Sequence, residues 1–200
     1  MSHDPAPELN RLQRRSAVAR LIGDGSEFLI VAGLAGTKHD VLAATGPDCP
    51  TVFAMGGAMG GAVAMGLGLA LARPRRRVLV VTGDGELLMN VGALATVAVL
   101  NPPNLGIVCV DNEHYGETGF QKSHTARGVN LAAMAQGAGI AAVSAVTESA
   151  QLGAAATLLR ESNGSVFVLL KVAADYPPGI RTTWDAALVK LRFRDALKLR

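Results

Sequence analysis

The sequence predicts an α/β protein with one doubly wound, mostly parallel sheet of about six strands, flanked by helices. Short apolar runs rich in Val and Ile alternate along the chain with longer segments of helical character. Strands that alternate with helices form parallel sheets through right-handed crossovers. Half of the 200 residues are hydrophobic, 23 are Gly and 4% are aromatic, which favours a core of Ala, Val and Leu. This length suits one domain covering residues 1–200.

The expected elements follow from these runs in chain order. Buried strands are apolar runs punctuated by Gly, and we expect them at 28–32, 51–55, 78–81, 105–110, 140–146 and 165–172. The segments between them predict helices at 9–22, 40–44, 57–72, 86–100, 130–136 and 148–162. A basic tail from about residue 181 closes as a helix over 183–199. Turns are expected at the paired prolines of 102–104 and 177–179.

Composition excludes several classes of function. The net charge of +3 is mild, and the arginine cluster at 73–77 predicts a solvated loop rather than a nucleic-acid-binding module. Cys49 and Cys109 form no C-x-x-C pair, which argues against a disulfide framework or a zinc or iron–sulfur site. The first ten residues are polar and contain two prolines, so we read no signal peptide and expect a cytoplasmic protein.

The uncharged segment 54–72 has nearly the length of a membrane span, but it contains six glycines and few large apolar side chains. Its small residues are typical of closely packed helices. We therefore expect no membrane insertion. An exposed apolar surface around 55–72 instead predicts an obligate interface, through which the isolated chain could form a homo-oligomer.

Two polar residues mark the ends of neighbouring predicted strands. Asp84 follows the apolar run 78–81, and Asn112 follows the run 107–110, with a predicted helix between them. Ligands of parallel sheets bind at the carboxyl ends of the strands. A carboxylate and an amide oxygen are hard ligands that suit Mg²⁺, which favours bound phosphates for its remaining positions.

The ordered set of motifs resembles the thiamin-diphosphate-binding motif of the thiamin-dependent decarboxylase and acetolactate synthase superfamily. Its parts are Gly83-Asp84-Gly85, the Asp111-Asn112 pair followed by Tyr115-Gly116, and a Gly-rich segment at 56–60 that is similar to G-S-M-G. The segment 118–121 resembles the T-G-G-Q of sulfopyruvate and phosphonopyruvate decarboxylases. The resemblance covers residues 25–175 and implies the thiamin-diphosphate-binding fold, its diphosphate-binding half in particular.

This resemblance implies the metal and phosphate ligands. Mg²⁺ would be held by the side chains of Asp84 and Asn112 and by the main-chain carbonyl of His114. The N–H groups of Gly85 and Glu86 would meet the diphosphate at a helix start. Relatives often have Ser or Ala at the latter position, so we expect the Glu86 carboxylate to turn away from the phosphates.

It also implies the remaining cofactor contacts. Thr37 matches a diphosphate contact, and Met59 matches the bulky residue that forces the two cofactor rings into a V. The carbonyl of Gly57 would accept from the aminopyrimidine, with Ala58 beside it. Tyr115 and Gly116 would close the metal loop.

Several charged or titratable residues near these loops are candidates to meet an acidic substrate, although a lone His or Lys on a loop is more often merely solvated. They are Lys38, His39, His114, Glu117 and His124.

The resemblance also implies what this chain lacks. In the superfamily, the cofactor is activated by a Glu on a separate pyrimidine-binding domain, and 200 residues hold only the diphosphate-binding unit. We expect a partner α subunit with the cofactor bound between the two. The predicted function is the diphosphate- and Mg²⁺-binding β subunit of a 2-oxo acid decarboxylase that releases CO₂ and an aldehyde.

Three alternatives stay open at this point. The first is a carboligase of the acetolactate synthase type or an oxidising relative, and the second is a non-catalytic subunit that kept the fold. A dinucleotide-binding domain is the third, although no G-x-G-x-x-G follows the first strand.

Overall fold

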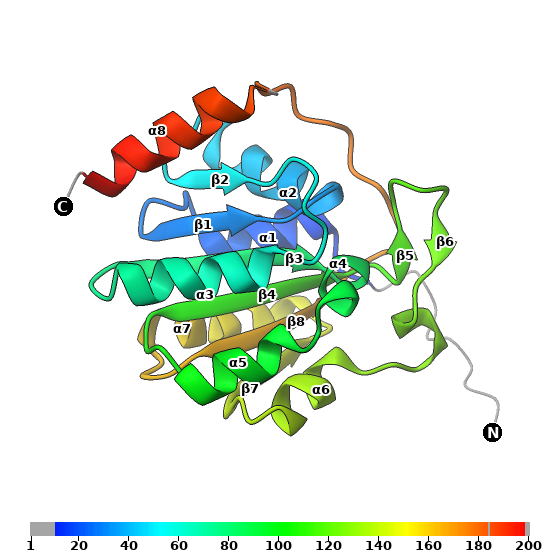
Figure 1. Cartoon of the computed structure of the whole chain (residues 1–200). Helices are drawn as coiled ribbons and strands as arrows, with labels where there is room; N and C mark the ends of the chain where they lie inside the picture. Colours follow the sequence, from blue (N-terminus) through cyan, green and yellow to red (C-terminus); the bar gives the residue numbers. More distant parts are fainter. Residues whose placement is uncertain (1–10, 184, 199–200) are drawn as a thin grey trace.

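The fold is built on a six-stranded sheet with every neighbouring pair parallel, in the order β2-β1-β3-β4-β8-β7 (Figure 1). This computed structural model describes residues 11–183 and 185–198. The strands are β1 (Phe28–Ala32), β2 (Val52–Ala54), β3 (Arg77–Gly83), β4 (Leu105–Asp111), β7 (Ala142–Val146) and β8 (Val166–Lys171). The architecture confirms the predicted doubly wound α/β fold.

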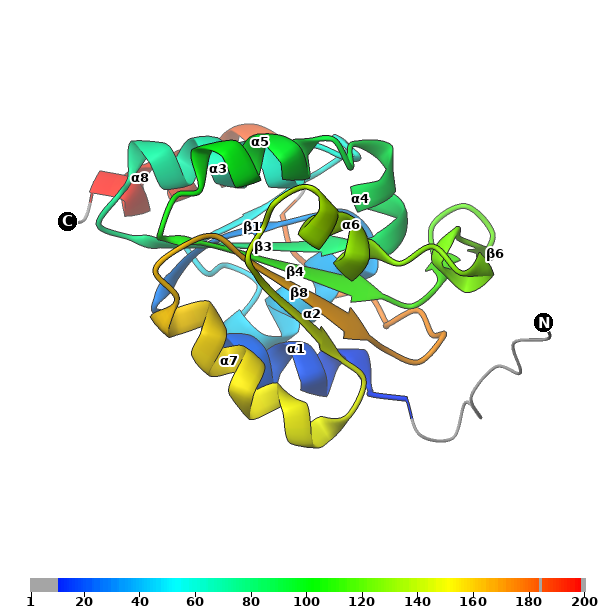
Figure 2. The same cartoon turned by 90° about the horizontal axis from the view of Figure 1, so that it is seen from below.

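Helices cover both faces of the sheet, as Figure 2 shows. One face carries α3 (Ala62–Ala72), α4 (Asp84–Met89), α5 (Ala93–Leu100), α6 (Leu131–Gly137) and α8 (Ala186–Lys198). The opposite face carries α1 (Arg14–Ile22), α2 (Gly36–Thr45) and α7 (Leu152–Glu161). Short 3₁₀ turns precede α6 at Thr125–Arg127 and α7 at Ser149–Gln151.

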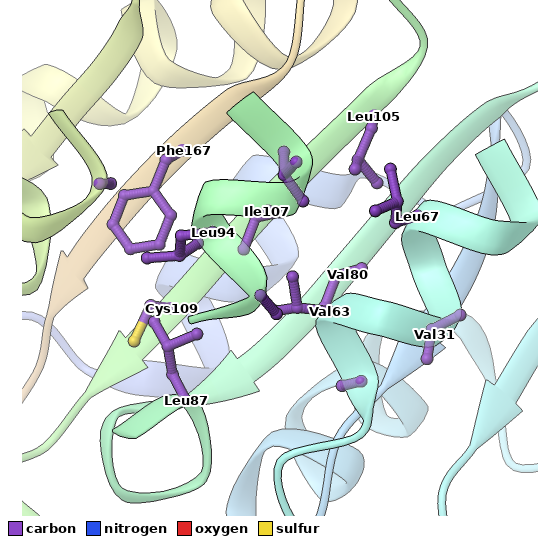
Figure 3. Close-up of a cluster of buried hydrophobic side chains, with 14 of the residues drawn as sticks. Val31, Val63, Leu67, Val80, Leu87, Leu94, Leu105, Ile107, Cys109 and Phe167 are labelled. Carbon is purple, nitrogen blue, oxygen red and sulfur yellow. The ribbon is translucent and has the colours of Figure 1, made fainter. Parts of the chain in front are cut away.

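The core consists of aliphatic side chains from both faces of the central strands. Val80 and Ile107 pack with Val63, Leu67 and other residues from the α3 side (Figure 3). Every residue of β1 and β4 is buried, as expected for strands covered on both sides. Burial of such side chains contributes about 1.5–3 kcal/mol each relative to exposure.

The strand order places the site. From β1 the chain adds β2 on one side and then crosses to β3 on the other, so the order reverses between β1 and β3. The paired registers align Ala32 with Val81 and Gly83 with Val110, which brings the carboxyl ends of β1, β3 and β4 to one edge. Ligands of open α/β sheets bind in the crevice at such a reversal.

Helix boundaries differ from the sequence prediction where a turn intervenes. The predicted helix at 86–100 is two helices, α4 and α5, because Asn90 leaves the helix and donates from Nδ2 to the Gly60 carbonyl at 3.2 Å. The predicted helix at 57–72 begins only at Ala62, because Gly57 and Gly60 have positive φ values of 142° and 84°.

Other differences are at the ends of elements. The helix predicted at 40–44 starts earlier, at Gly36, and the tail helix starts later, at Ala186. The start of the predicted helix at 9–22 and residue 199 lie outside the described residues. The structure adds an antiparallel hairpin of β5 (His114–Tyr115) and β6 (Gln121–Lys122) that the sequence analysis did not predict.

The uncharged segment 54–72 does not form one long helix. It comprises the end of β2, a glycine-rich loop and the eleven residues of α3. Within the described ranges, no helix has both the length and the apolar character needed to cross a bilayer.

Candidate functional site

A cavity of about 100 Å³ lies at the strand-order reversal. Its wall is formed by the loops that follow β1, β3 and β4, with single side chains added from other elements. These contributions are residues 34–37, 83–86, 112 and 114–118, together with Val110, Arg14, Met59 and Tyr176. Most of the residues implicated by the motifs are therefore brought together in one place.

Asp84 begins α4 and is almost completely buried, with 2% of its surface exposed. Its Oδ2 accepts hydrogen bonds from the hydroxyls of Ser123 and Thr125, the latter at 3.2 Å. Burial and the nearby Asp111 raise the pKa of Asp84 to about 6, although the two hydroxyls and the Gly85 N–H oppose the shift. A bound cation would favour the ionised form of this carboxyl.

Asn112 is buried beside the same cavity. Its Nδ2 donates to the Asp175 carbonyl at 3.1 Å, and its Oδ1 accepts the His114 N–H at 3.2 Å. The His114 ring bonds through Nδ1 to the Asn112 carbonyl at 2.9 Å and stacks on Phe120 with 4.4 Å between the centroids. The His114 ring is therefore held by local contacts, and the residue lines the cavity in the loop that follows β4.

A charged network supports the loop that follows β4. Lys171 Nζ lies 2.9 Å from Asp111 Oδ2 and 2.5 Å from Glu113 Oε1, and Arg11 also pairs with Glu113 at 3.1 Å. Burial would lower the pKa of Lys171, but the charge of Asp111 and bonds to both carboxylates raise it. Thr125 joins the network to Asp84, because its single hydroxyl proton is shared between Asp111 Oδ1 at 2.7 Å and Asp84 Oδ2 at 3.2 Å.

The sequence analysis missed this network and the hydroxyls that bind Asp84. Ser123 and Thr125 lie about forty positions after Asp84 and belong to no recognised motif. Only the alternation of Ser123 and Thr125, which gives two buried hydroxyls in an otherwise exposed segment, could have indicated an inward-facing pair.

One side of the cavity wall, formed by the loops after β1 and β3, consists of backbone and small residues. Thr37 is 2% exposed, and its hydroxyl donates to the Leu34 carbonyl at 2.7 Å. Gly85 lies under the ring of Tyr115, where an added Cβ would be 2.4 Å from Cε1. Gly85 therefore permits Tyr115 to cover the start of α4.

Glu86 only partly follows the expectation. It does lie in the first turn of α4, but its carboxyl is buried in the cavity wall. Oε2 accepts the Thr82 hydroxyl at 2.9 Å and the Leu34 N–H at 3.2 Å, while Oε1 has no hydrogen-bond partner within the described structure. Burial raises the pKa of Glu86, while these hydrogen bonds act in the opposite direction.

The glycine-rich segment reaches the cavity through one side chain. Met59 lines the cavity and is 41% exposed, so it is not an ordinary core residue. Gly57 and Ala58 are also exposed but do not line this cavity.

The candidate substrate-facing residues separate into two groups. Glu117 lines the cavity, whereas His124 does not, although its Nδ1 lies 3.2 Å from the hydroxyl of the lining residue Tyr115. Lys38 instead lines a neighbouring cavity of about 120 Å³ between α2, β2 and α8. His39 Nδ1 accepts the Ile180 N–H at 3.0 Å, so this ring holds the 180 loop rather than facing the first cavity.

A sequence profile of the thiamine pyrophosphate enzyme family, C-terminal TPP binding domain, matches residues 32–170. The chain belongs to this family. Thiamine pyrophosphate, abbreviated TPP, is thiamin diphosphate. The matched range contains the whole cavity wall except Arg14 and Tyr176.

Two curated relatives are similar in sequence. Over 88 residues, the chain is 48% identical to sulfopyruvate decarboxylase subunit beta of Methanocaldococcus jannaschii, covering 44% of this chain and 46% of that protein. Over 191 residues, it is 35% identical to phosphonopyruvate decarboxylase of Streptomyces viridochromogenes, covering 95% of this chain and 47% of that protein. The matches thus span about half the length of each relative.

The fold also matches solved structures. Benzoylformate decarboxylase from Polynucleobacter necessarius superposes with a TM-score of 0.66 at 16% identity, covering 88% of this chain and 36% of that one. This likeness concerns the fold alone.

Proposed function

We propose that this chain is the diphosphate- and Mg²⁺-binding subunit of a two-subunit, thiamin-diphosphate-dependent 2-oxo acid decarboxylase. The observation that carries the proposal is that Thr37, Met59, Asp84 and Asn112 line one and the same cavity, at the strand-order reversal. We also retain the cytoplasmic setting as a prediction.

The donor set fits magnesium. Asp84 Oδ2 accepts two hydroxyls, which leaves Oδ1 for a cation, and Asn112 contributes a second hard oxygen. The His114 carbonyl is the third proposed ligand. Mg²⁺ characteristically takes one or two carboxylates or similar ligands and completes its shell with phosphate oxygens and water.

The cavity also fits the cofactor. Thiamin diphosphate supplies, when bound, a ring that acts as an electron sink for the loss of CO₂. The chain's own residues would position it: Thr37 and the N–H groups of Gly85 and Glu86 would hold the diphosphate, and Met59 would support the ring system. Tyr115 and Gly116 close the metal loop against water.

A pyrimidine-binding partner would supply the activating carboxylate. The outer face of α3 and α5 supports a place for it, because the groove between these helices contains no charged residue. Large apolar side chains are exposed on the two helices, including Leu71 of α3 at 49% and Val99 of α5 at 84%. Asn90 joins this face to the cavity through the carbonyl of Gly60, next to Met59.

The substrate class we propose is a 2-oxo acid with a second anionic group, such as sulfopyruvate or phosphonopyruvate. The similarity to relatives that carry these names supports it. A carboligase has less support, since the acetolactate synthase matches cover 60 residues, or 30% of this chain.

The reaction is tested by coexpressing the chain with a candidate pyrimidine-binding subunit and measuring CO₂ release from a panel of 2-oxo acids. We expect release from the sulfonate or phosphonate substrate, dependent on both subunits and on thiamin diphosphate. Asp84→Ala should abolish it, while Asp195→Ala, at an exposed position on α8, should not. If pyruvate is the only 2-oxo acid that releases CO₂, and acetolactate forms, the result would favour the carboligase instead.

A further inference from the structure

Arg14 is a buried cation in the cavity wall that no motif includes. It begins α1 and is 5% exposed. Its Nε donates to Asp40 Oδ2 at 2.8 Å and its Nη1 to the Asp175 carbonyl at 3.2 Å. The third nitrogen, Nη2, makes no hydrogen bond to any residue that the structure describes, and Arg14 lines the cavity.

The free arm of the guanidinium lies against the start of α2. A Cβ on Gly36 would come within 2.3 Å of Nη2, so only glycine permits this approach. The N-terminus of the ten-residue α2 has no side-chain cap, and the preceding Ala35 has a φ of 58°. The first N–H groups of a helix lack intrahelical partners and attract anions. Two independent anion-attracting features therefore meet at Gly36.

The same guanidinium is joined to the proposed metal ligand. The Asp175 carbonyl accepts both Arg14 Nη1 and Asn112 Nδ2, the latter at 3.1 Å. An anion in the cavity would consequently have the Mg²⁺ ligands on one side and Arg14 with the start of α2 on the other. A group with several anionic oxygens fits this arrangement better than one carboxylate.

We propose that Arg14 binds the outer phosphate of the cofactor diphosphate through Nη2, with Asp40 as the residue that positions the guanidinium. This inference rests on the proposed function, because it takes thiamin diphosphate as the ligand. A purely structural clamp between α1 and α2 would need only the Asp40 and Asp175 bonds. It would not require a bare Gly36 or an unbonded nitrogen in the cavity wall.

The experiment measures binding of inorganic pyrophosphate with Mg²⁺ to the full chain by titration calorimetry. The test protein is the double variant Arg14→Gln/Asp40→Asn, which removes both charges and leaves no unpaired buried carboxylate. We expect it to keep the melting temperature of the unliganded chain and to bind pyrophosphate about ten- to one-hundredfold more weakly, the effect of one lost charge-assisted hydrogen bond. Arg20→Gln on the same helix is the matched control and should bind normally.

Unchanged pyrophosphate affinity in the double variant would overturn the proposal and leave Arg14 as a clamp. If the double variant does not fold, Arg14→Lys is measured instead, because lysine can still pair with Asp40 but cannot also reach the anion. The same loss of affinity supports the proposal and unchanged affinity overturns it. Absence of pyrophosphate binding to the wild-type chain, both alone and together with its candidate pyrimidine-binding subunit, would refute the proposed cofactor role itself, and this inference with it.

Discussion

Replacing Asp84 by Asn should stabilise the chain in the absence of metal, although Asp84 is a proposed metal ligand. Asp84 is 2% exposed, and its pKa rises from 3.8 to about 6. A shift of about two pKa units corresponds to roughly 3 kcal/mol at a pH where the folded carboxyl is ionised. Asn keeps an oxygen that can accept the Ser123 and Thr125 hydroxyls but has no charge to bury. Functional sites commonly show this exchange of stability for activity.

The gain should depend on pH in a defined direction. Between pH 3.8 and about 6 the folded chain binds more protons at Asp84 than the unfolded chain does, so the wild type loses stability as the pH rises through this window. Well below pH 3.8 the carboxyl is neutral in both states, and the two proteins should differ little there. Above about pH 6.5 the variant should be more stable by about 3 kcal/mol.

Urea unfolding in EDTA from pH 4 to 8 measures this difference. Asp195→Asn is the control, because Asp195 is exposed on α8 and should show no gain at neutral pH. Adding Mg²⁺ at pH 7.5 should then stabilise the wild type and leave Asp84→Asn unchanged. An Asn variant that is less stable than the wild type at pH 8, or a gain that is the same at every pH, would refute the reasoning.

Three further substitutions test the supports of the site by thermal or urea unfolding. Gly85→Ala should cost about 1–3 kcal/mol, because its Cβ would meet the Tyr115 ring at 2.4 Å; an unchanged melting temperature would contradict this packing. Lys171→Met should lower the free energy of unfolding by about 2–4 kcal/mol, because it leaves Asp111 buried without its counter-ion. An unchanged free energy of unfolding would show that water takes the place of the lysine beside Asp111. Thr125→Val should lower the free energy of unfolding by about 1–3 kcal/mol, because it removes the 2.7 Å hydrogen bond to Asp111 without changing the volume of the site. Equal stability of the variant and the wild type would show that Thr125 does not belong to the network.

The sheet was predictable because its strands are buried on both faces and read as continuous apolar runs, as in β1 and β4. Helix boundaries were harder to predict because they depend on distant contacts. Nothing local shows that Asn90 will leave the helix to bind the Gly60 carbonyl, thirty positions earlier in the chain. The β5–β6 hairpin contains only two residues per strand, which is too short for an alternating pattern to identify.

The candidate site was predictable where a motif fixes backbone geometry, as at Asp84, Gly85 and Asn112. It was not predictable where a side chain reaches the cavity from another element. Arg14 lies more than twenty residues before the nearest motif segment, and its place beside Gly36 follows from the packing of α1 on α2. Lys38 shows the reverse case, since the sequence placed it near the site while its helix turns it toward a neighbouring cavity.

The most direct test of the account is calorimetric titration of thiamin diphosphate and Mg²⁺ into this chain together with its candidate pyrimidine-binding subunit. The account predicts tight binding to the pair, weak binding to this chain alone, and loss of binding to the pair when Asp84→Ala is present. Absence of binding under every condition, or tight binding that survives Asp84→Ala, would contradict the assignment of this cavity as the diphosphate and magnesium site.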